Sequence, residues 1–330
     1  MKSGLISIII PSYNEANNIE LLYKSLEKEF TDIDYDYEIL FVNDGSTDDT
    51  LLVIKRLANA VPNIKYISFT RNFGKEMAIW AGFQHVKGDA VIVMDADLQH
   101  PCCLIKPFIK GYEEGYHQVI AQRNRKGDNR VRSFLSSLYY CAINRIVEVD
   151  IRDGAGDFRL LSRKAVDALL LLNEGNRFSK GLFSWIGMDQ KIIYYDNVVR
   201  NNGNSKWSFS NLLNYGIDGI VSFNNRPLRM CFYTGAFILI ASLLYIFVNL
   251  IIIMNQGIVE PGYFTTISAV LFLGGIQLLS LGVIGEYIGR IYYETKKRPH
   301  YLIHETNVES GEGNASTEPG IHEIHRSWDH

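Results

Sequence analysis

The sequence has few cysteines, and their spacing excludes the usual cysteine-based sites. Only four cysteines occur in 330 residues, and two of them, Cys102 and Cys103, are adjacent. An adjacent pair is a poor framework for disulfide bonds, and no cysteine spacing is typical of zinc ligands. We therefore expect a reducing compartment and no zinc site.

The sequence has no strong charge excess, and its N-terminal apolar run does not favour a signal peptide. The formal net charge is −3, which gives no reason to expect a nucleic-acid partner. The first apolar run ends at Pro11 and is too short for a signal-peptide core, so it predicts a strand instead. Residues 303–330 contain six acidic side chains against Arg326 alone, which leaves the rest of the chain mildly basic. This polar, glycine-bearing tail is predicted to be disordered.

Charged residues are absent from two long stretches near the end of the chain. No Asp, Glu, Lys or Arg occurs from Cys231 to Val259 or from Pro261 to Gly285. Each stretch exceeds the roughly 20 residues that span a bilayer, so we predict two transmembrane helices over 231–254 and 263–285. Basic residues flank this hairpin on both sides and are missing from its connection, so we expect the N-terminal domain and both termini to lie in the cytoplasm at the plasma membrane.

The first 120 residues alternate strand-like and helix-like segments. The predicted strands begin the stretches "LISIIIPSYNEANN" and "YEILFVNDGSTDDT" and occupy "IKYISFTRN" and "DAVIVMDAD", and helical spacing covers residues 17–30, 50–60 and 74–86. This alternation predicts an α/β fold with an open, mostly parallel sheet and helices on both faces. We divide the chain into an N-terminal α/β domain (1–206), amphipathic helices (207–230), the transmembrane hairpin (231–289), a juxtamembrane segment (290–302) and the tail (303–330). The helices over 207–230 either lie in the membrane interface or pack on the soluble domain.

Polar residues cluster where the predicted strands end. Ligands of such sheets bind beyond the carboxyl ends of the strands. Asp44 follows the second strand, where a carboxylate can accept hydrogen bonds from a nucleoside or can cap a turn. Asp95, Asp97 and Gln99 follow the fourth strand and offer the oxygen ligands that Mg²⁺ or Mn²⁺ prefers, although such aspartates also cap turns.

Four stretches together resemble glycosyltransferase family 2, in its polyprenyl-phosphate branch with dolichol-phosphate mannose synthase and bacterial undecaprenyl-phosphate glucosyltransferases. They are "IIIPSYNEANNI", "VNDGSTDDT", "NFGKEMAIWAGFQHVKGDAVIVMDADLQHP" and "DGAGDFRLLSR". The resemblance covers about residues 5–300 and implies the nucleotide-diphospho-sugar transferase fold and a homo-oligomer.

Site roles also follow from this resemblance. It assigns Asp157 as the catalytic base, and Asp95, Asp97 and Gln99 to the metal. The nucleotide-sugar donor would contact Pro11, Tyr13, Glu15, Asp44, Asp95, Arg200, Ser205, Lys206 and Trp207. From the residues alone, a loop aspartate that bonds its own backbone is the alternative interpretation of Asp157.

An arginine-rich stretch, "QRNRKGDNRVRSFLSS", suits a phosphate. Arg132 and Ser136 at i and i+4 of a helix would present both groups to one ligand, and Arg123 matches a further acceptor-phosphate arginine of the family. A basic helix near an anionic membrane is the alternative interpretation.

We expect a metal-dependent enzyme that moves a hexose or N-acetylhexosamine, with inversion, from a nucleotide sugar to a polyprenyl phosphate. Similarity to the bacterial members favours UDP and undecaprenyl phosphate. A processive polysaccharide synthase is disfavoured because no Q-x-x-R-W segment occurs, and an oxidoreductase because no G-x-G-x-x-G follows the first strand. A non-catalytic, nucleotide-sugar-binding membrane anchor is the remaining alternative.

Overall fold

The computed structural model describes residues 4–124, 155–172, 174–175, 177, 179–195 and 262–308, together with single positions between 233 and 255. These residues fall into two units. The first contains every described strand and the helices numbered up to α7, and the second contains α10. The predicted amphipathic helices over 207–230 lie outside the described residues.

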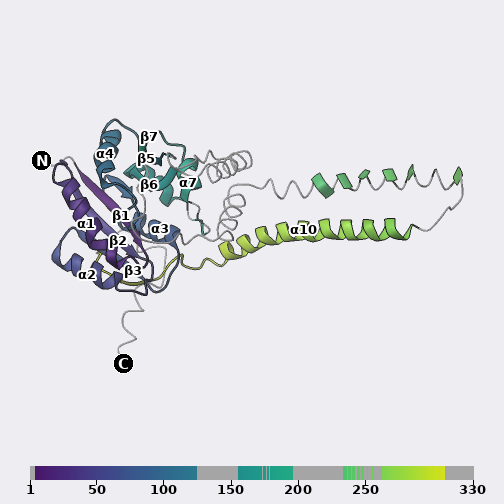
Figure 1. Ribbon diagram of the computed structural model, residues 1–330, viewed down its shortest axis with the longest axis horizontal. Coiled ribbons are helices and arrows are strands. Elements are labelled where there is room, and N and C mark those ends of the chain that lie inside the picture. The colour runs from purple at the N-terminus through teal and green to yellow at the C-terminus, as the bar shows by residue number, and fades with distance from the viewer. Residues whose placement is uncertain are drawn as a thin grey trace, which may run out of the picture. The chain divides into compact units, whose positions relative to one another are not determined.

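Within the described residues, the first unit is built on one eight-stranded sheet (Figure 1). Its order is β7-β5-β6-β4-β1-β2-β3-β8, and β6 and β8 run antiparallel to their neighbours while the other pairs are parallel. The strands are β1 (Leu5–Ser12), β2 (Asp36–Asn43), β3 (Ile64–Phe69), β4 (Ala90–Val93), β5 (Gln118–Arg123), β6 (Ala155–Ser162), β7 (Gln190–Tyr195) and β8 (Ile303–Thr306).

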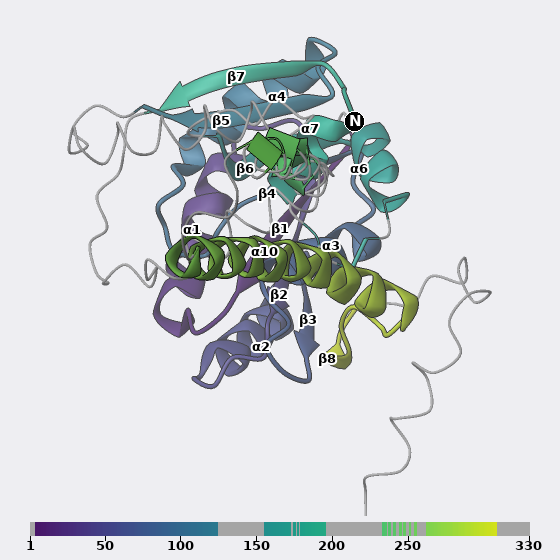
Figure 2. The ribbon, with the colours of Figure 1, turned by 90° about the vertical axis from the view of Figure 1, so that its right-hand side faces the viewer.

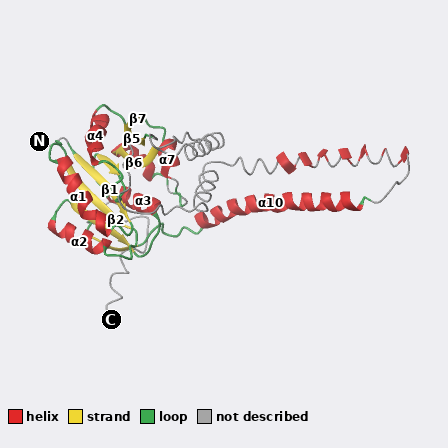
Figure 3. Cartoon of the chain, viewed as in Figure 1, coloured by secondary structure: helices red, strands yellow, loops and turns green. Residues whose placement is uncertain are grey.

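Helices cover both faces of the sheet, as the colours of Figure 3 make clear. One face carries α1 (Ala16–Phe30), α2 (Thr50–Ala60), the short 3₁₀ helix η1 (Cys102–Leu104) and α4 (Ile105–Glu113). The other carries α3 (Lys75–His85), α6 (Arg163–Leu170) and α7 (Ser179–Trp185). Figure 2 shows α1 and α3 on opposite sides of β1.

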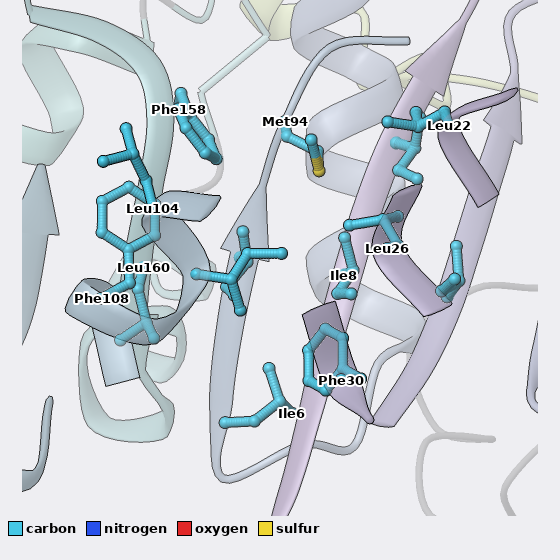
Figure 4. Close-up of a cluster of buried hydrophobic side chains, with 14 of the residues drawn as sticks. Ile6, Ile8, Leu22, Leu26, Phe30, Met94, Leu104, Phe108, Phe158 and Leu160 are labelled. Carbon is cyan, nitrogen blue, oxygen red and sulfur yellow. The ribbon is translucent and has the colours of Figure 1, made fainter. Parts of the chain in front are cut away.

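The core explains why these helices dock where they do. Figure 4 shows the α1 side chains Leu22, Leu26 and Phe30 facing Ile6 and Ile8 of β1. These side chains recur at the three- and four-residue spacing that places them on one helix face. On the opposite face Gly82 lets α3 approach β1 closely, because a Cβ there would lie 2.4 Å from a side-chain carbon of Ile9.

The four predicted strands and the three predicted helices of the first 120 residues are confirmed, although β3 and β4 end three and four residues before the predicted ends. Strands that are apolar on both faces form the centre of the covered sheet, as expected. The antiparallel strands β6 and β8 were not predicted. Their neighbours in the sheet lie far away in the sequence, so local periodicity carries no sign of the pairing.

The prediction that residues from 303 onward are disordered is wrong for Ile303–Thr306. This segment forms β8 and pairs with β3, and Glu305 Oε2 lies 2.7 Å from Lys55 Nζ. The Asn307 side chain accepts a hydrogen bond from the backbone N–H of Tyr66 and donates one to the carbonyl of Ile64. These contacts with distant residues stabilise a segment that is too short and too polar to read as a strand. Residues 309–330 lie outside the described part of the chain.

The second unit contains one long apolar helix, α10 (Tyr263–Thr295). Among the described residues, only Phe272–Thr295 is long and apolar enough to cross a membrane, and none of this stretch is buried in the structure. The helix continues past the predicted end at 285, across the Glu286–Arg290 ion pair. For the predicted span at 231–254, the described positions from Tyr233 to Met254 are helical, and the others lie outside the described residues.

Candidate active site

One edge of the sheet collects the carboxyl ends of β1 to β5 and β7, together with the start of β6. The strand registers establish this, because Ser12 pairs with Asn43, Asn43 with Ser68, and Val93 of β4 with Arg159 of β6. Asp157 lies two residues before Arg159 and therefore at the same edge. The structure brings together at this edge those predicted site residues that it describes.

The loop after β1 is held by the loop after β2. Asn14 has a left-handed φ of 56°, and its side-chain oxygen accepts a hydrogen bond from the Thr47 N–H at 2.9 Å. The Glu15 N–H donates to the Thr50 hydroxyl at 2.8 Å. Tyr13, which precedes Asn14, is exposed, and Pro11 is buried. Two predicted donor loops are thus fixed to each other by the fold itself.

Both carboxylate oxygens of Asp44 accept hydrogen bonds from the backbone. Its Oδ1 accepts from the N–H of Phe73 at 2.7 Å, and its Oδ2 accepts from the N–H of Gly74 at 3.0 Å. The side chain is 3% exposed, and burial raises the pKa of the carboxyl despite these two bonds. Next to it, Gly45 has a φ of +62°, and a Cβ there would lie 2.3 Å from the carbonyl carbon of Arg71. Asp44 therefore positions the loop at 71–74 in addition to any contact with a nucleoside.

The centre of the site is an ammonium group between two carboxylates. Lys75 Nζ lies 2.6 Å from Asp95 Oδ1 and 2.7 Å from Asp157 Oδ2. Lys75 begins α3, directly after the loop that Asp44 holds, whereas Asp95 follows β4 and Asp157 belongs to β6. Three separate elements therefore meet at this one ion-paired cluster.

Asp157 is the most enclosed member of this cluster. Its side chain is only 13% exposed. Burial raises the pKa of its carboxyl, but the positive charges of Lys75 and Lys180 outweigh burial and hold the pKa well below the usual range. Its Oδ1 is buried and has no hydrogen-bond partner among the described residues. An ionised carboxylate with one unused oxygen can accept a bond from a ligand.

His100 contacts Asp95 through both ring nitrogens. Its Nδ1 accepts a hydrogen bond from the Asp95 N–H at 3.0 Å, which places the ring proton on Nε2, 4.0 Å from Asp95 Oδ2. Burial lowers the pKa of His100, so the ring is neutral at pH 7. The ring stacks on Phe158 with 4.6 Å between centroids. His100 therefore fixes the turn that carries the predicted metal ligands.

A second buried network lies behind Asp157. Glu76 Oε2 accepts hydrogen bonds from the backbone N–H and the hydroxyl of Ser179, which joins α3 to α7. The buried Arg159 lies over the ring of Phe183 at 3.9 Å and donates to the carbonyl of Gly156 at 2.7 Å. Burial, followed by the charge of Asp157, raises the pKa of Glu76 to about 7.

The predicted metal ligands have suitable chemistry for a divalent cation held jointly with a substrate. No group of three or more His, Cys, Asp or Glu side chains forms a metal cluster in the described part of the chain. Mg²⁺, however, is ordinarily held by one or two carboxylates and by substrate phosphates rather than by a complete protein cage. Asp95 and Asp97 supply two such carboxylates, and Asp97 Oδ1 already accepts from the Gln99 N–H at 3.1 Å. This oxygen donor set fits Mg²⁺ or Mn²⁺.

The remaining predicted residues divide into two groups. Arg123 ends β5, beside Tyr195 in the sheet register, at the edge that carries Asp95. The others lie outside the described residues, namely Arg132, Ser136, Arg200, Ser205, Lys206 and Trp207.

Sequence reasoning missed Lys75, Glu76 and His100 as members of the site. A signal for Lys75 was available, because it follows the third predicted strand by a few residues and so must lie near the same sheet edge. The Glu76–Ser179 contact joins residues that are 103 positions apart, so no local pattern marks it.

Comparisons with known proteins identify the family of the chain. Residues 7–170 match the family model "Glycosyl transferase family 2", and residues 226–291 match "GtrB C-terminal hairpin". The chain is 72% identical to "Putative glycosyltransferase CsbB" of Bacillus subtilis (strain 168), covering 93% of this chain and 94% of that protein. It is 42% identical to "Bactoprenol glucosyl transferase" of Shigella phage SfX, covering 90% and 98% respectively.

Among solved structures, one similar protein is the mannosyltransferase PcManGT from Pyrobaculum calidifontis in complex with GDP-Man and Mn²⁺. The two are 19% identical with a TM-score of 0.44, over 61% of this chain and 58% of that one.

Proposed function

The chain belongs to glycosyltransferase family 2, in the polyprenyl-phosphate branch, and from that premise we propose that it makes a lipid-linked monosaccharide. The donor in this proposal is a UDP-sugar that carries a hexose or N-acetylhexosamine, and the acceptor is undecaprenyl phosphate. The observation that carries the proposal is the carboxylate cluster at the sheet edge, in a chain that also contains a long uncovered apolar helix. Relatives named for bactoprenol glucosyl transfer support the same substrate class.

The acceptor needs little activation. A phosphate monoester has a second pKa near 6 and is largely dianionic at neutral pH. Its oxygen attacks the anomeric carbon of the sugar, and the bond from that carbon to the diphosphate breaks on the opposite side, which inverts the configuration. The low pKa of Asp157 makes this carboxylate a weak base. Asp157 therefore orients the reacting groups rather than removing a proton, and positioning accounts for most of the catalysis.

Asp95, Asp97 and Gln99 would hold a divalent cation together with the donor diphosphate. When bound, such a cation neutralises the charge that develops on the departing diphosphate. The chain contributes the fixed turn after β4, in which His100 accepts from the Asp95 N–H and Asp97 accepts from the Gln99 N–H. This turn presents the carboxylates at the edge of the sheet where the donor loops end.

Donor and acceptor would bind from two sides of this edge. Pro11, Tyr13, Glu15 and Asp44 lie on loops that face the nucleoside in our proposal. Arg123, Arg132 and Ser136 are proposed to hold the acceptor phosphate, because arginine forks suit phosphate oxygens. The segment with Arg200, Ser205, Lys206 and Trp207 is proposed to close over the donor.

The lipid acceptor requires a membrane, and the relatives named for bactoprenol transfer indicate a membrane-associated enzyme. We propose that α10 is one span and that residues 231–254 form another, consistent with the matched C-terminal hairpin. Both termini and the catalytic domain would then be cytoplasmic at the plasma membrane. The amphipathic helices over 207–230 would lie at the interface, and a homo-oligomer remains part of the proposal.

A panel of labelled nucleotide sugars tests this function. Membranes that contain the chain are incubated with each donor and with undecaprenyl phosphate, and the organic-soluble products are separated by chromatography. We expect one donor to give a single glycolipid that carries one sugar. Label that appears in a water-soluble polymer would instead favour a processive synthase. Retention of donor without any product would favour a non-catalytic anchor.

A further inference from the structure

Lys75 lies where an incoming divalent cation would have to compete with it. Its ammonium group contacts Asp95 Oδ1 at 2.6 Å, and Asp95 is a predicted metal ligand. The same ammonium contacts Asp157 Oδ2 at 2.7 Å, so one positive charge serves two carboxylates that belong to different strands.

The ion pairs of Lys75 differ from an ordinary surface ion pair because both carboxylates are partly buried. The Lys75 side chain is 41% exposed, whereas Asp157 is 13% exposed and Asp95 is 29% exposed. Like charges brought together at a partly buried site repel each other strongly when no counter-charge is present. Lys75 removes this repulsion in the protein without metal or donor.

The backbone around Lys75 is also fixed. Asp44 accepts hydrogen bonds from the N–H groups of Phe73 and Gly74, the two residues before Lys75. The next residue, Glu76, is bonded to Ser179 of α7. The side chain of Lys75 therefore starts from a backbone that the donor half of the site and the second network both hold.

We propose that Lys75 is a positioning residue that acts as an internal counter-ion, holding Asp95 and Asp157 together and keeping free divalent metal weakly bound until a nucleoside diphosphate arrives. The diphosphate brings negative charge that attracts both the metal and the ammonium, so both cations are then accommodated. Metal binding and nucleotide binding thereby become coupled, and coupling between two ligands is reciprocal. This inference rests on the metal site of the proposed function.

The test measures Mn²⁺ binding rather than sugar transfer. Full-length protein in detergent is titrated with Mn²⁺, with and without UDP, and free Mn²⁺ is followed by electron paramagnetic resonance. Lys75→Gln removes the charge, Lys75→Arg keeps it, and Lys180→Gln is the matched control. Lys180 also contributes positive charge near Asp157, but it lies on α7 and not at the start of α3.

For Lys75→Gln we expect Mn²⁺ alone to bind about tenfold more tightly than in the wild type, which corresponds to about 1.4 kcal/mol. The factor by which UDP tightens Mn²⁺ binding should shrink to a similar extent. Lys75→Arg should resemble the wild type, and Lys180→Gln should change Mn²⁺ affinity by less than about twofold. Without metal, Lys75→Gln should melt at a lower temperature, and Mn²⁺ should raise that temperature more than it does for the wild type.

Two results would overturn the inference, and they have different meanings. If Lys75→Gln binds Mn²⁺ no more tightly than the wild type, Lys75 does not compete with metal, while the transfer function is unaffected. If no variant binds Mn²⁺, with or without UDP, the metal site itself is wrong and the inference fails with it. A merely structural lysine would lower the melting temperature but would leave Mn²⁺ affinity unchanged or weaker.

Discussion

Two aspartates at the same edge of the sheet have opposite surroundings. Asp44 follows β2 and directs both carboxylate oxygens to backbone N–H groups of the loop at 73–74. Asp157 on β6 directs one carboxylate oxygen to the ammonium group of Lys75 and keeps one buried oxygen without a partner among the described residues. The comparison indicates that the fold uses the first carboxylate and leaves the second available for ligands.

The same difference separates the two halves of the site. In the half formed by β1, β2 and β3, loops are bonded to each other through Asn14, Thr47 and Asp44. In the half formed by β4 and β6, the polar groups are carboxylates that face the charge of Lys75. We therefore expect substitutions in the first half to affect mainly stability and donor affinity, and those in the second half to affect mainly turnover.

The largest effect should follow Asp157→Asn. Removing the charge that orients the reacting groups should lower the rate of transfer by about 10²-fold, while donor affinity changes little. Steady-state kinetics of the glycolipid product, together with equilibrium binding of the donor, measure both quantities. Asp167→Asn, an exposed aspartate on α6, is the control. A wild-type rate for Asp157→Asn would remove this residue from the mechanism.

Asp44→Ala should act on stability instead. Two backbone N–H groups would lose a charged acceptor inside the protein, which should cost about 1–3 kcal/mol in the free energy of unfolding. The donor KM should rise because the loop at 71–74 loses its support. Asp49→Ala is the matched control, since Asp49 lies at the start of α2 and forms no side-chain cap hydrogen bond. If Asp44→Ala is as stable as the wild type, Asp44 does not support the loop at 73–74, and the contrast with Asp157 is wrong.

Glu76, which lies next to Lys75 in the second half of the site, makes the stability of the protein depend on pH. Burial and then the charge of Asp157 raise its pKa from 4.5 to about 7. Between those values the folded state holds a proton that the unfolded chain has released. This group therefore makes stability fall as pH rises through that window, by at most about 1.4 kcal/mol per pH unit.

Glu76→Gln should remove that fall, because the amide oxygen can still accept from Ser179 and does not titrate. Thermal unfolding at pH 5, 6 and 7 should show the variant gaining on the wild type as pH rises. Parallel curves for the two proteins would contradict the raised pKa.

The smallest effect should come from Glu305→Gln on β8. Its ion pair with Lys55 at 2.7 Å is partly exposed, so we expect a loss of about 0.2–1 kcal/mol in unfolding free energy and no change in turnover. The exposed pair of Lys106 and Asp32 offers a comparison through Lys106→Gln. A marked loss of turnover in Glu305→Gln would mean that β8 acts on the reacting half of the site.

The central strands could be predicted because short stretches of the sequence identify each of them. Apolar runs such as Ile6–Ile10 and Val91–Met94 identify buried strands, and the polar residues after them identify the sheet edge. The same sequence could not show β8, because Ile303–Thr306 is stabilised by residues about 240 positions away. It also could not show that Asp44 is bonded to the N–H groups of residues 73 and 74, which requires the arrangement of two loops in space.

The sequence identified the carboxylates of the candidate site but not the side chain that contacts them. Asp95 and Asp157 stand out through their positions and through the family resemblance. Lys75 gives only a weak positional signal, because a lysine at the start of a helix is common on protein surfaces. Only the structure shows that its ammonium lies between the two carboxylates.

One measurement tests the central claim most directly. Purified wild-type protein and Asp95→Ala are placed in lipid nanodiscs with undecaprenyl phosphate and labelled UDP-sugar, and the lipid product is identified by mass spectrometry. We predict that the wild type forms a single monoglycosylated lipid phosphate, that EDTA abolishes it and added Mn²⁺ restores it, and that Asp95→Ala forms none. Undiminished product in EDTA, or from Asp95→Ala, would contradict the account.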